Sequence, residues 1–292
     1  MTASREKSER LNTPKIIILR KTGCGISLFY HSAKRLLTSL SSYVTILLSM
    51  DELSDRQTKI LQAIIEEYME IAAPVGSENL ERKHELGVSP ATVRNEMVKL
   101  TKAGYLKQPH ASAGRIPTKQ SFRFYIDRLM EEKKLSVADE VAAREKVWDA
   151  RFNFDKLMHE ATKGLAARTK TLAVAATDDG NIYSAGYANI LAIPEFYDID
   201  VTRTILEMLD EVKPLMGLFQ KSFGEEPIHF LFGDELGYEL LEPCGMVFAR
   251  FDAGPQKSGS LGIIGPCRLN YPTVVPLVRY FAGLVEELAK TI

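Results

Sequence analysis

Side chains that can donate hydrogen bonds gather on one face of a helix that the sequence predicts from Pro90 onward. Ser89 suits the position before the helix, and Pro90 suits its first turn, where the N–H that proline lacks would have no partner. Val93, Met97 and Leu100 recur at helical spacing, so their face is predicted to turn inward. The opposite face carries donors suited to phosphates and to the edges of bases. These donors are Thr92, Arg94, Asn95, Lys99 and Lys102.

A short basic loop follows this helix. Gly104 is expected to end the helix, Tyr105-Leu106 to begin a short strand, and residues 109–117 to form the loop. Residues 86–123 contain seven lysines and arginines and one acid, Glu96, although the formal charge of the whole chain is only −1. A small region polarised in this way presents one positive face, which predicts a polyanionic partner such as DNA.

Further helices are expected to support the basic one. Ser54 begins an S-x-x-Q capping box, which predicts a first helix, and Ser77 is expected to cap a second helix after the break at 74–76. Thr118 is expected to cap a fourth helix after the loop. This order is that of a winged helix-turn-helix, whose third helix enters the major groove. Two alternatives remain, namely a solvated helix with a charged exterior and a three-helix module of an unrelated enzyme.

The donors can be assigned different roles at DNA. Arg94 and Asn95 are the candidates for reading bases, since both can make bidentate contacts. His110 and Arg115 are expected to contact the DNA backbone or to enter the minor groove, and the alternative for Arg115 is that it braces the loop. Lys99, Lys102, Lys107 and Lys119 are better candidates for phosphates. The full set of predicted DNA contacts is Ser89, Thr92, Arg94, Asn95, Lys99, Lys102, Lys107, His110, Ser112, Arg115 and Lys119.

In and near the basic helix the chain contains the segments PVGS (74–77), LGVSPATVRNEM (86–97), GYLKQPHASAGRIPT (104–118) and FRFYID (122–127). These segments closely resemble the HrcA family of bacterial heat-inducible transcription repressors. The segments near the C-terminus, ILAIPEF (190–196), FGDELG (232–237) and GSLGIIGPCRLNY (259–271), resemble the GAF-like domain of that family. The resemblance implies a dimeric repressor that binds an inverted-repeat operator upstream of chaperone genes, is supported by the GroE chaperonin and is inactivated by heat.

The chain departs from this resemblance in two places. It is shorter than the resemblance leads us to expect between Thr177 and Ile190, so we expect the family's inserted dimerisation domain to be absent or much reduced. Residues 1–49 are basic and Ser-rich and match no part of the family. We favour an upstream start codon, with Met50 as the natural initiator, and expect no packed fold there. A targeting peptide and a disordered basic arm that adds DNA affinity are the alternatives.

The predicted fold class is α+β. A winged helix-turn-helix at 50–130 is expected to be joined by a helical linker at 131–168 to a GAF-like regulatory or dimerisation domain at 169–292. In the last part, strands are predicted at 172–177, 182–187, 228–232, 245–251 and 260–264, and a final helix at about 273–288. An amphipathic helix is predicted from Thr202 to about Gln220, with Pro214 ending or kinking it. Trp148 is expected to anchor the junction between linker and domain.

Enzyme signatures are missing from the sequence. His159-Glu160 lacks the second histidine of a zinc protease motif, and no nucleophile elbow is present. Cys24, Cys244 and Cys267 are scattered, which predicts neither a zinc site nor a disulfide framework and suits a cytoplasmic protein. We therefore predict a DNA-binding protein without catalytic activity or cofactor.

The alternative function is that of a regulator whose GAF-like domain senses a ligand or a partner and acts on other genes. It would require a small apolar pocket, for which Phe196, Tyr197, Phe230 and Phe248 are the candidate lining residues.

Overall fold

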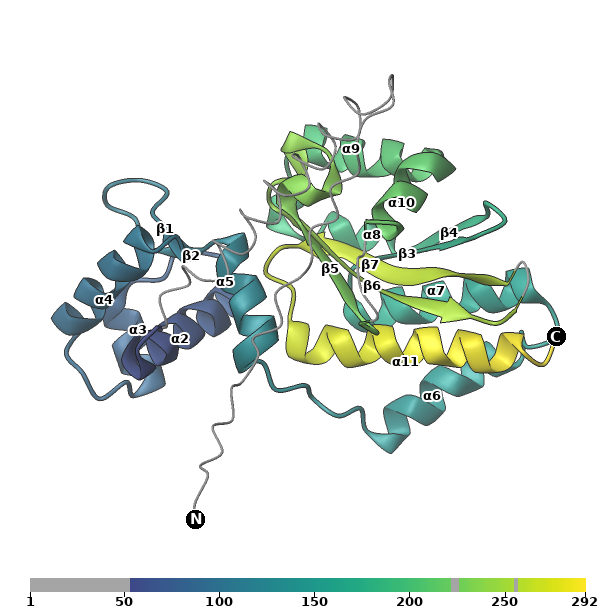
Figure 1. Cartoon of the computed structure of the whole chain (residues 1–292), viewed down its shortest axis with the longest axis horizontal. Helices are drawn as coiled ribbons and strands as arrows, with labels where there is room; N and C mark the ends of the chain where they lie inside the picture. The colour runs from purple at the N-terminus through teal and green to yellow at the C-terminus, as the bar shows by residue number, and fades with distance from the viewer. Residues whose placement is uncertain (1–52, 222–225, 255–256) are drawn as a thin grey trace, which may run out of the picture. The chain divides into compact units, whose positions relative to one another are not determined.

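The computed structural model describes residues 53–221, 226–254 and 257–292 (Figure 1). The predictions made for residues 1–49, including those for Cys24, lie outside the described residues. Residues 53–292 form one compact unit that contains helices and an antiparallel sheet. The fold is therefore α+β.

The elements of residues 53–130 follow the predicted order. They are α2 (Asp55–Ile71), α3 (Ser77–His84), α4 (Pro90–Lys102), β1 (Leu106–Lys107), β2 (Ile116–Pro117), α5 (Lys119–Phe124) and the π-helical turn η1 (Tyr125–Leu129). Strands β1 and β2 pair antiparallel, with Leu106 opposite Pro117. The inward face predicted for α4 is buried, since Val93, Met97 and Leu100 are at most 4% exposed.

The helix caps confirm two predictions and correct two others. Ser54 and Gln57 form the predicted capping box, and the Ser89 side chain caps α4. Gly76, not Ser77, precedes α3, and Ser77 is instead a buried first residue of that helix. Thr118 precedes α5, but its hydroxyl does not cap the helix. It donates to the carbonyl oxygens of residues 104 and 105 at 2.7 and 3.1 Å, which ties α5 to the end of α4.

A five-stranded antiparallel sheet forms the second part of the unit. Its order is β4-β3-β7-β6-β5, with β3 (Leu172–Thr177), β4 (Ile182–Ala185), β5 (His229–Phe232), β6 (Cys244–Asp252) and β7 (Ser258–Pro266). The predicted hairpin of β3 and β4 is present. Its turn passes through Gly180, whose φ of +93° lies in the left-handed region that glycine tolerates best.

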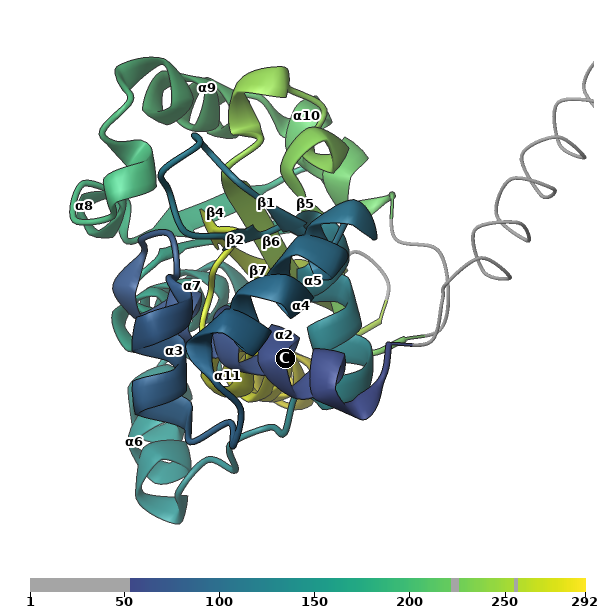
Figure 2. The same cartoon turned by 90° about the vertical axis from the view of Figure 1, so that its left-hand side faces the viewer.

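Helices cover both faces of this sheet (Figures 1 and 2). One face packs on α7 (Phe154–Thr169) and α11 (Tyr271–Ala289). The other carries α8 (Tyr187–Ile190), the 3₁₀ turn η2 (Pro194–Phe196), α9 (Ile199–Asp210) and α10 (Val212–Phe219). Alternate residues of β6 enter different cores, as a strand requires: Met246 and Phe248 join the cluster under α9 and α10, and Val247 the cluster under α11.

The expected linker, 131–168, contains α6 (Val137–Trp148) and most of α7. The apolar residues of α7, among them Leu157 and Leu165, are buried against the sheet and α11, so α7 forms part of the layer on the sheet. The helix expected from Thr202 to Gln220 is two helices, because the chain is extended at Glu211. Pro214 lies in the first turn of the second helix, where proline is tolerated.

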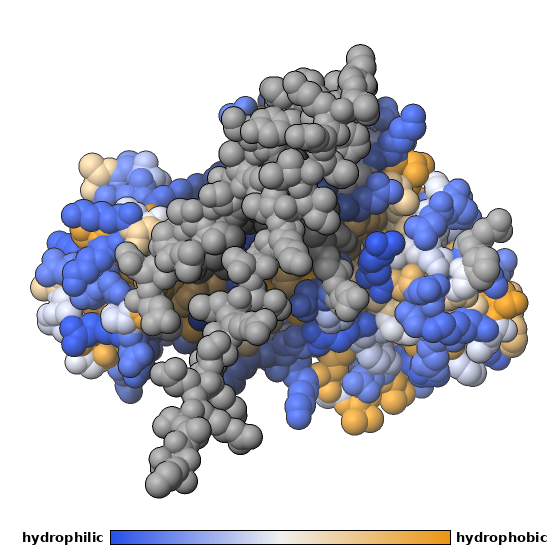
Figure 3. Space-filling view, in the orientation of Figure 1, coloured by the Kyte–Doolittle hydropathy of each residue, from blue (hydrophilic) through white to orange (hydrophobic). Residues whose placement is uncertain are grey.

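Trp148 does not anchor a junction, which corrects that prediction. The indole is 41% exposed, and the Arg151 guanidinium stacks on it at 4.4 Å. Val137 and Val141 are also exposed, and Figure 3 shows an apolar patch at the lower edge, where Figure 1 places α6.

Two further 3₁₀ turns, η3 (Gly233–Leu236) and η4 (Glu239–Leu241), connect β5 to β6. No helix of the described residues is both long and apolar enough to cross a membrane.

Candidate nucleic-acid interface

The start of α4 is held by two of the predicted contact residues. The Ser89 hydroxyl accepts a hydrogen bond from the backbone N–H of Thr92 at 3.3 Å, and the two hydroxyls lie 3.0 Å apart. An N-cap of this kind stabilises a helix by about 1 kcal/mol. Ser89 is exposed at the N-terminus of α4, and a helix N-terminus favours a negatively charged group.

The outward face of α4 carries unpaired donors. Arg94, Asn95 and Lys102 are exposed, and none of them forms a side-chain hydrogen bond or ion pair with any residue that the structure describes. Lys99 differs, because its ammonium lies 2.9 Å from the Glu96 carboxylate. That hydrogen bond holds the pKa of Glu96 below its ordinary value, and the carboxylate is almost fully buried. The unpaired donors therefore remain available to a ligand.

The loop between β1 and β2 is pinned to the helices by backbone contacts. Val75 and Arg115 exchange two backbone hydrogen bonds of 2.9 Å. A side chain at Gly114 would place its Cβ 2.4 Å from the carbonyl oxygen of Val75, so only glycine allows this approach. The Gln108 amide spans the loop, donating to the carbonyls of Ala111 and Ala113. The loop is thus a defined structure beside α4.

The side chains of this loop differ in their contacts. Arg115 donates from Nε to the Thr101 hydroxyl of α4 at 3.2 Å, as expected if it braces the loop. His110 and Ser112 are exposed near the tip, with Nδ1 and Oγ 3.1 Å apart. A cleft of about 490 Å³ lies between the loop and one side of α4. The lining includes Arg94 of α4, residues 75–77 before and at the start of α3, and Ser112 and Arg115 of the loop. The structure therefore brings the predicted base-reading residue Arg94 together with these two loop residues.

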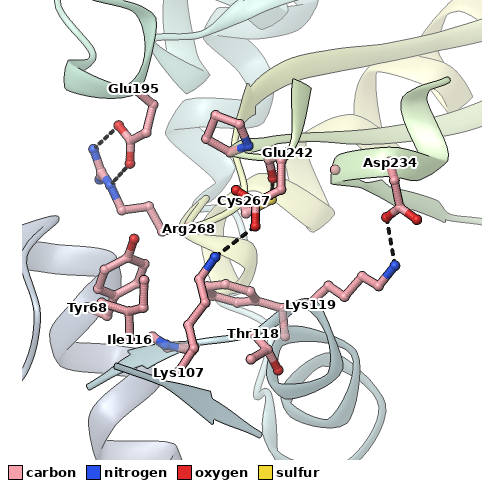
Figure 4. A pocket seen from close by; sticks show the side chains of 14 residues that line it. Tyr68, Lys107, Ile116, Thr118, Lys119, Glu195, Asp234, Glu242, Cys267 and Arg268 are labelled. Carbon is pink, nitrogen blue, oxygen red and sulfur yellow. Dashed lines mark hydrogen bonds and ion pairs between the residues drawn. The ribbon is translucent and has the colours of Figure 1, made fainter. Parts of the chain in front are cut away.

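Two other predicted phosphate contacts lie elsewhere and are paired. Lys107 Nζ lies 2.7 Å from Glu242 Oε1, and Lys119 Nζ lies 2.6 Å from Asp234 Oδ1 (Figure 4). The hydrogen bond from Lys119 holds the pKa of Asp234 below its ordinary value. A third cation, Arg123, contacts Glu235 in the same way. The three carboxylates follow β5 and therefore belong to the sheet part of the unit.

The two lysine pairs line a second cleft, also of about 490 Å³, between the helical part and the sheet part. At its edge the Arg268 guanidinium donates to both oxygens of Glu195 at 2.6 and 3.0 Å (Figure 4). The same guanidinium donates to the Met69 carbonyl at 3.3 Å. The Cys267 thiol lies in the lining, where burial raises its pKa to about 12. It donates to the Cys244 carbonyl, so Cys267, just after β7, contacts the start of β6.

Sequence reasoning missed the acidic partners of these cations. Asp234, Glu235 and Glu242 lie 112 to 135 residues after the bases that they contact. The one available signal was that FGDELG, which contains two of them, belongs to the segments that carried the family resemblance.

The apolar pocket required by the alternative function is not formed by the four aromatic residues named for it. Phe196 and Phe248 are buried in the cluster under α9 and α10, whereas Phe230 packs into the cluster under α11 on the opposite face of the sheet. Tyr197 is 69% exposed. Phe230 lies opposite Val247 and not opposite Phe248, so the alternation of the paired strands sends Phe230 and Phe248 to opposite faces of the sheet.

Comparison with known proteins decides the family. The model of a family described as "HrcA protein C terminal domain" matches residues 91–275, which is more than half of the chain. The chain belongs to the HrcA family. The family's curated relatives are named heat-inducible transcription repressors, so it is a repressor family and not an enzyme family.

Individual relatives agree with this assignment. The heat-inducible transcription repressor HrcA of Pelotomaculum thermopropionicum is 28% identical, with 82% of this chain and 98% of the relative covered. That of Symbiobacterium thermophilum is 26% identical, with 81% and 98% covered. A crystal structure titled a hypothetical protein has a TM-score of 0.69 at 20% identity, with 82% of this chain and 99% of that chain covered. This last likeness concerns the fold alone.

The lengths of these matches differ from the length of this HrcA chain. The match to the Pelotomaculum protein extends over 341 positions, whereas 82% of 292 residues is about 239 residues. About 100 positions of that match, the difference between 341 and 239, therefore face no residue of this chain.

Proposed function

We propose that this chain represses transcription by placing α4 in the major groove of an operator, with the β1–β2 loop as the wing. Residues 50–130 are then a winged helix-turn-helix domain, of which 53–130 are described. The observation that carries the proposal is the state of α4: its inner face is buried, and Arg94, Asn95 and Lys102 on its outer face have no partner among the described residues. A helix is about 10 to 12 Å across with its side chains, which fits a major groove about 12 Å wide, and the unpaired donors of α4 would then face the base edges.

The residues of this surface have distinct roles in the proposal. Arg94 and Asn95 read base edges, since a guanidinium can bond guanine and an amide can bond adenine through two atoms each. Ser89 and Thr92, at the N-terminus of α4, contact a phosphate together with the helix backbone. Lys99 and Lys102 contact phosphates, and Lys99 must share its charge with Glu96. His110 and Ser112 at the tip of the loop lie where a wing meets the minor groove or the backbone.

Arg115 has a double role in this proposal. Its Nε braces the loop against Thr101, and its terminal nitrogens make no hydrogen bond to a described residue. The same side chain is therefore able to hold the wing in place and to contact a phosphate with its outer edge. This combination is common for arginine, whose fork of donors can serve two partners.

The chain is further proposed to act as a dimer on an inverted repeat upstream of chaperone genes, in the cytoplasm. Two-fold symmetry of the protein would match two-fold symmetry of the operator. We infer that heat releases the DNA and that the GroE chaperonin supports the active state, as the family resemblance implies. Residues 169–292, with the α7 layer, form the GAF-like regulatory part, and the roughly 100 unmatched positions support the absence of the family's insertion.

Selection from a random pool of DNA duplexes tests the proposal. The full chain is expected to enrich an inverted repeat, and heating the complex is expected to release it reversibly. Asn95→Ala should enrich a repeat with relaxed preference at one position of each half-site. Enrichment of no sequence, or an unchanged preference in both Arg94→Ala and Asn95→Ala, would contradict the role given to α4.

A further inference from the structure

We propose that three carboxylates of the sheet part act as an internal competitor for DNA. These carboxylates, Asp234, Glu235 and Glu242, are called the acidic trio below. The inference rests on the proposed function and adds a regulatory element to it: the trio occupies the cations that would otherwise contact the DNA backbone. The carboxylates take the place of DNA phosphates, which are also oxyanions that accept hydrogen bonds from lysine and arginine.

Two of the three contacts involve lysines that the sequence alone had assigned to phosphates. Lys107 bonds Glu242 at 2.7 Å and Lys119 bonds Asp234 at 2.6 Å (Figure 4). At these distances each ammonium is in direct contact with a carboxylate, whose negative charge repels an approaching phosphate. The lysines must therefore exchange a carboxylate for a phosphate when DNA binds, and the free energy of each ion pair is subtracted from that of DNA binding.

The third contact is the one with the most defined geometry. Arg123 Nη2 lies 2.7 and 2.6 Å from the two oxygens of Glu235, and its guanidinium lies over the Phe232 ring at 5.2 Å. Glu235 also accepts a hydrogen bond from the backbone N–H of Phe232 at 2.9 Å. The Glu235 carboxylate is thus held by the backbone at the end of β5 as well as by Arg123. Its position therefore does not depend on the arginine alone.

The exposure of these groups sets the size of the effect. The Asp234 and Glu242 side chains are 70% and 65% exposed, and solvent screens ion pairs of this kind. Such pairs contribute at most about 1 kcal/mol, which is about fivefold in affinity for each pair. The trio therefore attenuates DNA binding and does not prevent it.

The test measures how removal of one charge changes DNA affinity. The full chain and its Asp234→Asn and Glu242→Gln variants are titrated against a fluorescent inverted-repeat duplex at low salt. Each variant is expected to bind up to about fivefold more tightly than the parent. The matched control is Glu239→Gln, because Glu239 is exposed in η4 between the members of the trio and pairs with no described cation. An equal gain in this control would overturn the proposal, since it would reflect net charge alone.

A double-mutant cycle separates competition from every other effect of the charge. In the Lys119→Ala background, Asp234→Asn is expected to give no gain, because no ammonium remains to be released. The same gain in both backgrounds, or no gain in either, would overturn the competitor role. Failure of the proposed function looks different: the parent and all variants would then show no preference for the inverted repeat over a scrambled duplex.

Discussion

Two basic surfaces of the chain differ in what surrounds them. On α4, Arg94, Asn95 and Lys102 are exposed without partners among the described residues, while the base of the wing and α5 carry Lys107 and Lys119 paired with carboxylates. Both surfaces contain basic residues of the same basic stretch of the sequence, residues 86–123. The difference arises because the sheet part folds against one of them and not the other, so a count of basic residues overstates the charge available to DNA.

The largest expected effect comes from removing a buried side chain that supports the exposed donors of α4. Leu100 is fully buried on the inner face of α4, and Leu100→Ala would leave a cavity that costs about 2 to 5 kcal/mol of unfolding free energy. Urea denaturation followed by circular dichroism measures this cost. Val98→Ala is the control on the same helix, because Val98 is 38% exposed and should change the stability little. Equal losses in both variants would mean that α4 does not present a distinct outer face.

Next in size is the loss of base reading. Arg94→Ala and Asn95→Ala should each cost about 1 to 3 kcal/mol of discrimination between the operator and a mismatched duplex, with the fold intact. Competition titrations with single-base variants of the duplex measure the discrimination. A uniform loss on all duplexes would assign these residues to phosphates.

A smaller effect distinguishes the two roles of Arg115. The hydrogen bond from Arg115 to Thr101 should contribute about 0.5 to 1.5 kcal/mol to stability. Thr101→Val removes that bond and the hydrogen bond from the Thr101 hydroxyl to the Met97 carbonyl within α4, but it leaves the outer nitrogens of Arg115 in place. Arg115→Ala removes the outer nitrogens as well. If Arg115 contacts DNA as well as bracing the wing, Arg115→Ala weakens DNA binding more than Thr101→Val does. Equal DNA affinities of the two variants would leave bracing as its one role.

The smallest expected effects are the losses of DNA affinity when one lysine of each surface is replaced. Lys102→Ala should weaken binding to all duplexes alike and reduce the slope of log affinity against log salt by about one. Lys119→Ala should weaken binding less, because the lysine must first leave Asp234. Titrations from low to physiological salt measure both quantities. A larger loss for Lys119→Ala would reverse the order of the two surfaces.

How far the sequence predicts this structure depends on the range of the interactions. The starts of α2 and α4 follow from the capping box at Ser54 and from Ser89 and Pro90, and these signals act within a few residues. The errors at Ser77 and Thr118 have a tertiary cause, since Ser77 is buried and the Thr118 hydroxyl is taken by carbonyls at the end of α4. A capping residue predicts a helix start but not which neighbour receives its hydroxyl.

The same limit applies to the candidate site. The sequence identifies Arg94 and Asn95, because the periodicity of α4 places them opposite its buried face. It does not identify Glu242 as the partner of Lys107, since 135 residues separate them and only the folded sheet brings them together. The strand order β4-β3-β7-β6-β5 is of the same kind, because β3 pairs with a strand that begins more than 80 residues later.

The central claim is that α4 reads an operator, and one titration tests it most directly. The full chain is titrated at physiological salt against a fluorescent duplex that carries the inverted repeat of a chaperone operon and against a scrambled duplex of equal length. The account predicts tight binding to the repeat alone, with two chains per duplex, and loss of this preference in the Arg94→Ala and Asn95→Ala double variant. Equal binding to both duplexes by the parent, or an intact preference in the double variant, would contradict it.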